Sequence, residues 1–140
     1  LRDHIENPRQ TDADLLRRPP EAMQAALRMR CEGLDDFHEV SEGMTLEIGD
    51  FRIEVMETPG HTPGGVCYLV RDGEESVLVS GDTLFARSVG RTDLPGGEPS
   101  RLDDSLRRLS KLPDPLVVLP GHGPETTIGE ERRHNPFWPA

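Results

Sequence analysis

Three apolar runs in this chain each end at a glycine that is followed at once by a side chain able to bind a metal ion. The three segments are Thr58-Pro59-Gly60-His61, Val79-Ser80-Gly81-Asp82 and Leu119-Pro120-Gly121-His122. A glycine adopts backbone conformations that side chains forbid, so it can direct the next residue across the end of a strand. If the three strand ends converge, two imidazoles and one carboxylate are presented to a single point.

The chemistry of these side chains favours a metal site at His61, Asp82 and His122. Imidazole nitrogens and carboxylate oxygens bind Zn²⁺, Mn²⁺ and Fe²⁺, and one carboxylate can bridge two ions. Two ions would generate a hydroxide near neutral pH and polarise a carbonyl, which favours hydrolysis. Each motif alone is weak evidence, because Pro-Gly-His and Gly-Asp are also ordinary turn sequences. Three ligands, moreover, are too few for two ions.

The apolar pattern around the motifs predicts an α/β layered domain with its helices outside the sheet. Alternating apolar residues predict a β-hairpin over residues 37–55, with a turn at Gly49-Asp50 and one buried face. Nearly unbroken apolar runs predict buried strands at residues 66–70, 77–80 and 116–119. The runs at 66–70 and 77–80 suit central strands that are covered on both faces.

In sequence order, helices are predicted before the strands and between the last two of them. Leucines at helical spacing predict an amphipathic helix between Pro99 and Leu112, capped by Ser100 and stopped by Pro113. Two short helices are predicted within residues 11–31. The tail, residues 129–140, is polar and then rich in proline and aromatic residues, and its pattern predicts no element.

Composition narrows the range of partners. The 140-residue chain has a formal net charge of −10, and this acidic field would repel phosphate backbones, so we expect no nucleic-acid partner. We also expect no membrane association, because no stretch approaches the roughly 18 apolar residues of a spanning helix. Cys31 and Cys67 form no disulfide framework, which favours a cytoplasmic location.

The motifs resemble those of a known family. Residues 57–65, 80–85 and 119–133 resemble the later motifs of the metallo-β-lactamase superfamily. More narrowly, residues 88–97 and the ending Asn135-Pro136-Phe137 resemble the compact glyoxalase II-like, or hydroxyacylglutathione hydrolase-like, enzymes. The resemblance implies the αββα sandwich of the superfamily, of which this chain would supply roughly the second half.

The same resemblance implies a role for each motif. The residue matching His61 binds a first metal, the one matching Asp82 bridges two, and the one matching His122 binds the second. The complete site would hold two zinc ions, with iron or manganese as alternatives. The family's remaining ligands come from a His-x-His-x-Asp-His loop, which this sequence lacks. Residues 1–140 are therefore expected to be the C-terminal portion of one domain whose N-terminal portion lies outside this sequence.

The loop Gly90-Arg91-Thr92-Asp93 is the candidate substrate contact. In the family it lies beside the metals, where glyoxalase II enzymes contact the glutathione part of the thioester. Arg91 would pair with a substrate carboxylate through its planar guanidinium. The alternative is an internal ion pair that holds the loop. Residues 131–133 are expected to form a solvated charged stretch or to pack against the loop, rather than to touch substrate.

The resemblance favours a metal-dependent hydrolase that cleaves a small-molecule thioester, of the hydroxyacylglutathione type, by a metal-bound hydroxide. A persulfide dioxygenase of the same fold, with a single iron, is one alternative. A metal-free, truncated interaction module is another. An isolated half-sandwich would leave one apolar sheet face uncovered, so we expect a dimer or association with the missing N-terminal portion.

Overall fold

The computed structural model describes Glu21 and residues 38–140. The chain divides into two compact units, residues 1–39 and residues 40–140, and the second unit contains the sheet and the three motifs. Glu21 is helical, whereas the rest of the helices predicted within residues 11–31 lie outside the described residues. Within the part of the chain that is described, no helix is long and apolar enough to cross a membrane.

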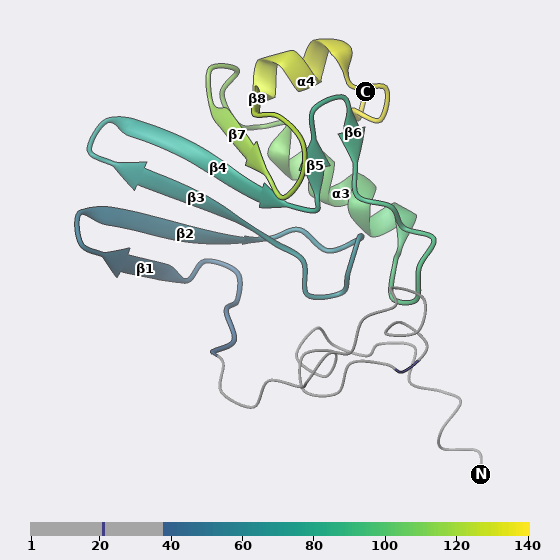
Figure 1. Ribbon diagram of the computed structural model, residues 1–140, viewed down its shortest axis with the longest axis horizontal. Helices are drawn as coiled ribbons and strands as arrows, with labels where there is room; N and C mark the ends of the chain where they lie inside the picture. Colours follow the sequence, from purple (N-terminus) through teal and green to yellow (C-terminus); the bar gives the residue numbers. More distant parts are fainter. Residues whose placement is uncertain (1–20, 22–37) are drawn as a thin grey trace. The chain divides into compact units, whose positions relative to one another are not determined.

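A mixed six-stranded sheet forms the framework of the second unit, with the strand order β1-β2-β3-β4-β7-β8 (Figure 1). The strands are β1 (Thr45–Ile48), β2 (Phe51–Glu57), β3 (Val66–Asp72), β4 (Glu75–Gly81), β7 (Val117–Pro120) and β8 (Thr126–Thr127). The predicted hairpin and the two predicted central strands are confirmed. A mixed sheet with few helices agrees with the partial αββα sandwich that the sequence resemblance implies.

Three strands of this sheet run in the same direction. Strands β2 and β4 are both antiparallel to β3, which lies between them, and β7 is parallel to β4. The carboxyl ends of β2, β4 and β7 therefore reach the same edge of the sheet. Each of the three motifs begins in one of these strands or directly after it, so the predicted convergence of strand ends is confirmed.

The hairpin of β1 and β2 is more exposed than its alternating pattern predicted. Only Val55 is buried, while Met44, Ile48 and Phe51 are 38%, 62% and 47% exposed. The reason is position: β1 is the edge strand of the sheet and contributes no residue to the hydrophobic core. The turn itself is as expected, with Gly49 at a φ of 59°.

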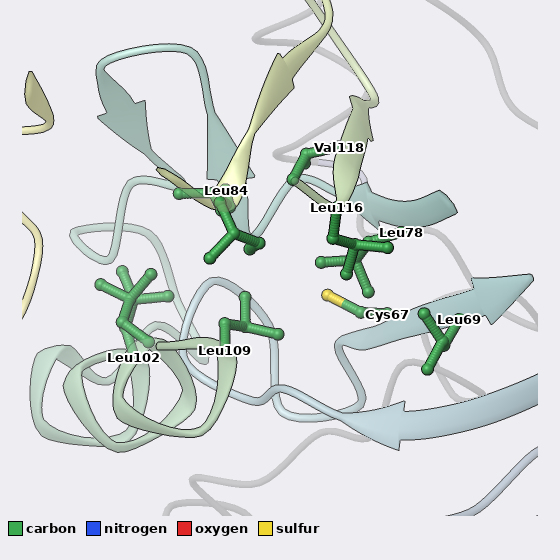
Figure 2. Close-up of a cluster of buried hydrophobic side chains, with 10 residues drawn as sticks. Cys67, Leu69, Leu78, Leu84, Leu102, Leu109, Leu116 and Val118 are labelled. Carbon is green, nitrogen blue, oxygen red and sulfur yellow. The ribbon is translucent and has the colours of Figure 1, made fainter. Parts of the chain in front are cut away.

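The hydrophobic core lies between one face of the sheet and helix α3 (Pro99–Leu109). Figure 2 shows the side chains of this core, which come from α3, from the sheet strands and from their connections. Its members include Cys67, Leu69, Leu78, Val118, Leu102, Leu106 and Leu109. Burial of such side chains is the main stabilising contribution to the fold.

The opposite face of the central strands is only half-buried, which corrects the expectation that β3 and β4 are covered on both faces. That face carries Val66, Tyr68, Val70, Val77 and Val79. Residues alternate between the two faces of a strand, so an unbroken apolar run does not by itself require two full covers. The face is thus neither fully covered, as the unbroken runs predicted, nor fully uncovered, as expected of an isolated half-sandwich.

Helix α3 begins one residue earlier than its predicted cap and ends before the predicted stop. Its N-cap is Glu98, which makes no side-chain cap, and Pro99 occupies the first turn, where its fixed φ suits a helix. Ser100 is therefore inside the helix rather than at its cap. The helix ends at Leu109 with Ser110 as C-cap, before Pro113 is reached.

Four short elements were not predicted. They are β5 (Leu84–Phe85), β6 (Ser88–Val89), β8 and helix α4 (Ile128–His134). The signal for α4 was present in the sequence as Thr-x-x-Glu: the Thr127 hydroxyl accepts a hydrogen bond from the Glu130 N–H at 3.1 Å. Two-residue strands such as β5 and β6 carry no periodicity that a sequence pattern can show.

Glu131 of α4 is buried rather than solvated. Its carboxylate accepts hydrogen bonds from the Arg87 N–H at 2.8 Å, the Thr126 hydroxyl at 2.6 Å and the Asn135 amide at 2.7 Å. These donors compensate the loss of water that burial imposes on a carboxyl group. Glu131 thus joins α4 to the turn between β5 and β6, so it neither forms a solvated stretch nor packs against the Gly90–Asp93 loop.

Candidate metal centre

The three predicted ligands meet where β2, β4 and β7 end. The carboxylate of Asp82 lies between the two imidazoles, with Oδ2 at 3.7 Å from Nε2 of His61 and Oδ1 at 2.9 Å from Nδ1 of His122. One carboxylate oxygen therefore faces each ring. Metal binding by these residues stays a prediction, but their placement satisfies its first requirement.

The donor set fits half of a two-metal site. Two ligands of one tetrahedral Zn²⁺ place their donor atoms about 3.3 Å apart, and the two separations at Asp82 lie on either side of that value. Within residues 38–140, no group of three or more histidine, cysteine, aspartate or glutamate side chains is placed to hold one ion. The separations fit a carboxylate shared by two ions, and the bridging role of Asp82 stays a prediction.

His61 is held firmly from the side opposite its candidate metal-binding atom. The ring is 25% exposed, and Nδ1 lies 2.7 Å from the backbone carbonyl oxygen of Arg91. A carbonyl oxygen only accepts hydrogen bonds, so this contact assigns the proton to Nδ1 and leaves the lone pair on Nε2. Metal-binding histidines commonly have such a partner on their second nitrogen.

The turn before His61 is held by α3. Gly60 has a φ of 142°, and a Cβ at this position would overlap the backbone of Leu102. The Glu98 N–H donates to the Gly60 carbonyl at 2.8 Å, and the Ser105 hydroxyl donates to the Pro59 carbonyl at 2.7 Å. Glycine is therefore required by close packing as well as by conformation.

The loops that follow β4 and β7 contact each other directly. The Gly121 N–H donates to the Gly81 carbonyl at 2.7 Å. Gly81 has a φ of 51°, and a Cβ on Gly121 would lie 2.7 Å from Oδ1 of Asp82. The two glycines thus let the Asp82 carboxylate approach the loop that carries His122.

A buried hydroxyl pair links the His61 and Asp82 loops, and sequence reasoning did not identify it. The Thr58 and Thr83 hydroxyl oxygens lie 3.1 Å apart, and Thr58 Oγ1 lies 3.3 Å from the Cys67 sulfur. Burial raises the pKa of the Cys67 thiol, which keeps it neutral. Cys67 is a free, structural thiol, as expected, whereas Cys31 lies outside the described residues.

His122 is held much less closely. Its side chain is 78% exposed. Besides the contact with Asp82, its ring lies against that of Phe85 at the end of β5, with ring centroids 6.0 Å apart. This open setting allows the imidazole to turn toward an ion or away from it.

The Gly90–Asp93 loop packs directly on the site. The Gly90 N–H donates to the Thr83 carbonyl at 3.1 Å, and a Cβ on Gly90 would overlap the backbone oxygen of Asp82. Arg91 donates through Nε and Nη2 to the two carboxylate oxygens of Asp93, each at 2.8 Å. These hydrogen bonds hold the pKa of Asp93 at about 2. The internal ion pair, the alternative to substrate contact, is therefore present.

A hollow of about 410 Å³ lies beside this loop. It is bordered by residues 89–92 and by Phe137, which is 56% exposed, and by Leu102 and Leu106 of α3. The hollow is large enough for part of a small molecule and combines apolar walls with the polar loop.

Comparison with known proteins identifies the family. Residues 2–122 match the model of the metallo-β-lactamase superfamily. An uncharacterized protein of Aquifex aeolicus is 49% identical over 100 residues, covering 71% of this chain and 46% of that protein. The hydroxyacylglutathione hydrolase GloC of Haemophilus influenzae is 42% identical over 97 residues, covering 69% and 45%. The chain thus spans less than half the length of these curated relatives.

Solved structures give the same assignment. The di-iron-bound form of TTHA1623 superposes with a TM-score of 0.78 at 38% identity, covering 92% of this chain and 62% of that one. The B3 metallo-β-lactamase BLEG-1 gives a TM-score of 0.80 at 38% identity, covering 94% and 64%. The strand-end motifs, the sheet and these similarities agree, and the chain belongs to the metallo-β-lactamase superfamily.

Proposed function

We propose that this chain is the C-terminal portion of a metal-dependent thioester hydrolase whose substrate is a small, glutathione-derived molecule of the hydroxyacylglutathione type. The observation that carries the proposal is the Asp82 carboxylate, which presents one oxygen to His61 and the other to His122. The similarity to GloC, described as a hydroxyacylglutathione hydrolase, supports the substrate class.

His61, Asp82 and His122 are the residues that would hold the metal. Divalent ions bound there would supply a nucleophile from water at neutral pH and polarise the thioester carbonyl. We propose zinc, although the similar TTHA1623 structure contains two irons. The other ligands of each ion would come from the portion of the fold outside this sequence, and that portion would also cover the half-buried face of the sheet.

Arg91 is the proposed substrate contact. Its Nε and Nη2 are engaged by Asp93, so a substrate carboxylate would meet the remaining N–H groups, chiefly those of Nη1. The adjacent hollow offers room for the rest of a small ligand beside the loop. The net charge of −10 argues against a nucleic-acid partner. We further propose a cytoplasmic location and no membrane association.

The test is hydrolysis of S-lactoylglutathione by the protein of natural length, loaded in turn with Zn²⁺, Fe²⁺ and Mn²⁺. Hydrolysis should occur and should be lost in Asp82→Asn. Hydrolysis should persist in the control variant Asp114→Asn, which removes a carboxylate that pairs with Arg132 and is not a candidate ligand. Absence of turnover with every metal would refute the proposal. One bound iron with oxygen uptake on glutathione persulfide would indicate the dioxygenase, and absence of metal binding would indicate an interaction module.

A further inference from the structure

We propose that the Gly90–Asp93 loop is a positioning device for the His61 ring, and that it acts through the Arg91 main chain rather than through the Arg91 side chain alone. The Arg91 carbonyl holds His61 in the tautomer that leaves Nε2 free, and the Arg91–Asp93 ion pair keeps that carbonyl in place. The inference rests on the proposed function, because it takes His61 as a metal ligand.

The contact between the loop and the ring is short and directional. Nδ1 of His61 lies 2.7 Å from the Arg91 carbonyl oxygen, while Nε2 lies on the Asp82 side, 3.7 Å from Oδ2. Protonation of Nδ1 is required by the first contact, so Nε2 carries the lone pair. Without that partner, a neutral imidazole would divide between two tautomers and two ring orientations.

The backbone of the loop reaches His61 only because residue 90 has no side chain. A Cβ on Gly90 would overlap the Asp82 carbonyl oxygen and would lie 2.9 Å from Cβ of His61. The Gly90 N–H is anchored on the Thr83 carbonyl at 3.1 Å. Position 90 therefore connects the loop to both ligand-bearing segments.

The far end of the loop is fixed by the ion pair. Arg91 and Asp93 are two residues apart and form two parallel hydrogen bonds of 2.8 Å, the strong geometry for a guanidinium and a carboxylate. A Cβ on Gly97 would overlap the backbone of Thr92, so the following turn packs against the loop as well. The loop is thus anchored at Gly90 and at Thr92, and the Arg91–Asp93 pair stiffens it from within, next to the Arg91 carbonyl.

The ion pair bears on the role of Arg91. Its Nε and Nη2 edge would give a substrate carboxylate a bidentate contact, and Asp93 already occupies this edge. Loss of Asp93 would free this edge for an anion and would also release the loop. The two roles for the loop therefore predict different effects of removing Asp93. A positioning role predicts weaker metal binding, and a pure substrate-binding role predicts unchanged metal binding.

The experiment compares Asp93→Asn with the unmodified sequence, both in the protein of natural length. The first measurement is ¹⁵N NMR of the His61 ring in the metal-free protein, in alkaline buffer so that the imidazole is neutral. The unmodified chain should show one tautomer with the proton on Nδ1, and Asp93→Asn should show a mixture. The second measurement is Zn²⁺ titration by calorimetry, in which Asp93→Asn should bind about tenfold more weakly, as expected for loss of outer support of a ligand.

Two further variants serve as controls. Asp114→Asn breaks the Arg132–Asp114 pair, also 2.8 Å long, at the opposite end of β7 from the site, and should change neither measurement. Asp93→Glu keeps the carboxylate and should recover much of the single tautomer. An unchanged His61 tautomer in Asp93→Asn, or a mixture already present in the unmodified chain, would overturn the inference. Absence of Zn²⁺ binding with a tautomer that responds to Asp93→Asn would instead refute only the metal-dependent function.

Discussion

His61 and His122 follow the same Pro-Gly sequence at the ends of parallel-running strands, yet the fold holds them very differently. The His61 side chain is 25% exposed and its Nδ1 is bonded to a backbone carbonyl, whereas the His122 side chain is 78% exposed and its Nδ1 faces Asp82. The motif therefore determines where each imidazole leaves the sheet. It does not determine how firmly the ring is held.

The difference comes from the segments packed around each ring. Helix α3 fixes the turn before His61, the Gly90–Asp93 loop fixes its ring, and the Thr58–Thr83 hydroxyl pair joins that turn to the Asp82 loop. Around His122 the ring contacts described are those with Asp82 and Phe85, and neither comes from a packed backbone segment. A ligand that is already oriented loses less conformational freedom on binding, so the His61 half of the site should bind its ion more tightly.

The largest effect should come from adding a methyl group at Gly90, which packs against the Asp82 backbone and His61. In Gly90→Ala the new Cβ would overlap the Asp82 carbonyl oxygen, which is backbone and cannot rotate away. We expect the free energy of unfolding to fall by about 3 kcal/mol, the upper range for overpacking. The measurement is urea denaturation followed by circular dichroism.

Gly121→Ala is the matched control on the His122 side. There the nearest atom is Oδ1 of Asp82 at 2.7 Å, which can turn about its side-chain bonds. We expect a loss of about 1 kcal/mol. Equal losses in the two variants would mean that the two halves of the site are equally rigid, against the comparison.

The two histidines should also differ in their effect on metal affinity. His61→Ala removes the oriented ligand, and we expect the Zn²⁺ dissociation constant of the protein of natural length to rise about 100-fold. His122→Ala should raise the dissociation constant about tenfold. A mobile side chain loses conformational entropy when it binds an ion, so its net contribution to affinity is smaller. Calorimetric titration of both variants measures the difference. A larger loss in His122→Ala would reverse the assignment of the firmer half.

The sequence predicted the positions of the candidate ligands better than the contacts that hold them in place. The three candidate ligands were predicted from strand, glycine and ligand in a row together with the family resemblance, because turn chemistry is a local property that a sequence motif records. The supporting contacts join residues far apart in the chain, such as Ser105 with Pro59 and His61 with the Arg91 carbonyl. Backbone carbonyls carry no residue identity, so no sequence pattern can reveal their partners.

Errors in the predicted fold have similar causes. The strands β3 and β4 were placed correctly, but the degree of cover on each face depends on which segments pack there. The buried Glu131 was placed in a charged run, Glu130 to Arg133, and only the tertiary contacts with Arg87 and Thr126 explain its burial. The cap of α4 was within reach, because Thr127 and Glu130 stand at the spacing of a capping box.

The smallest expected effect concerns the ion pair on the His61 side. The hydrogen bonds from Arg91 hold the pKa of Asp93 at about 2, below its ordinary value of 3.8. Because this pKa is lower in the folded chain than in the unfolded one, the ion pair contributes to stability fully above pH 3.8. Its contribution is lost as the pH falls from 3.8 through about 2.

The contribution should be small, because the Arg91 and Asp93 side chains are 61% and 68% exposed and water screens their attraction. The measurement is the ¹³C chemical shift of the Asp93 carboxyl, which should remain constant down to about pH 3. In Arg91→Ala the midpoint should return toward the ordinary value. If the unmodified chain already titrates there, the ion pair is not maintained in solution, and the loop would hold His61 through Gly90 and the packing of Thr92 alone.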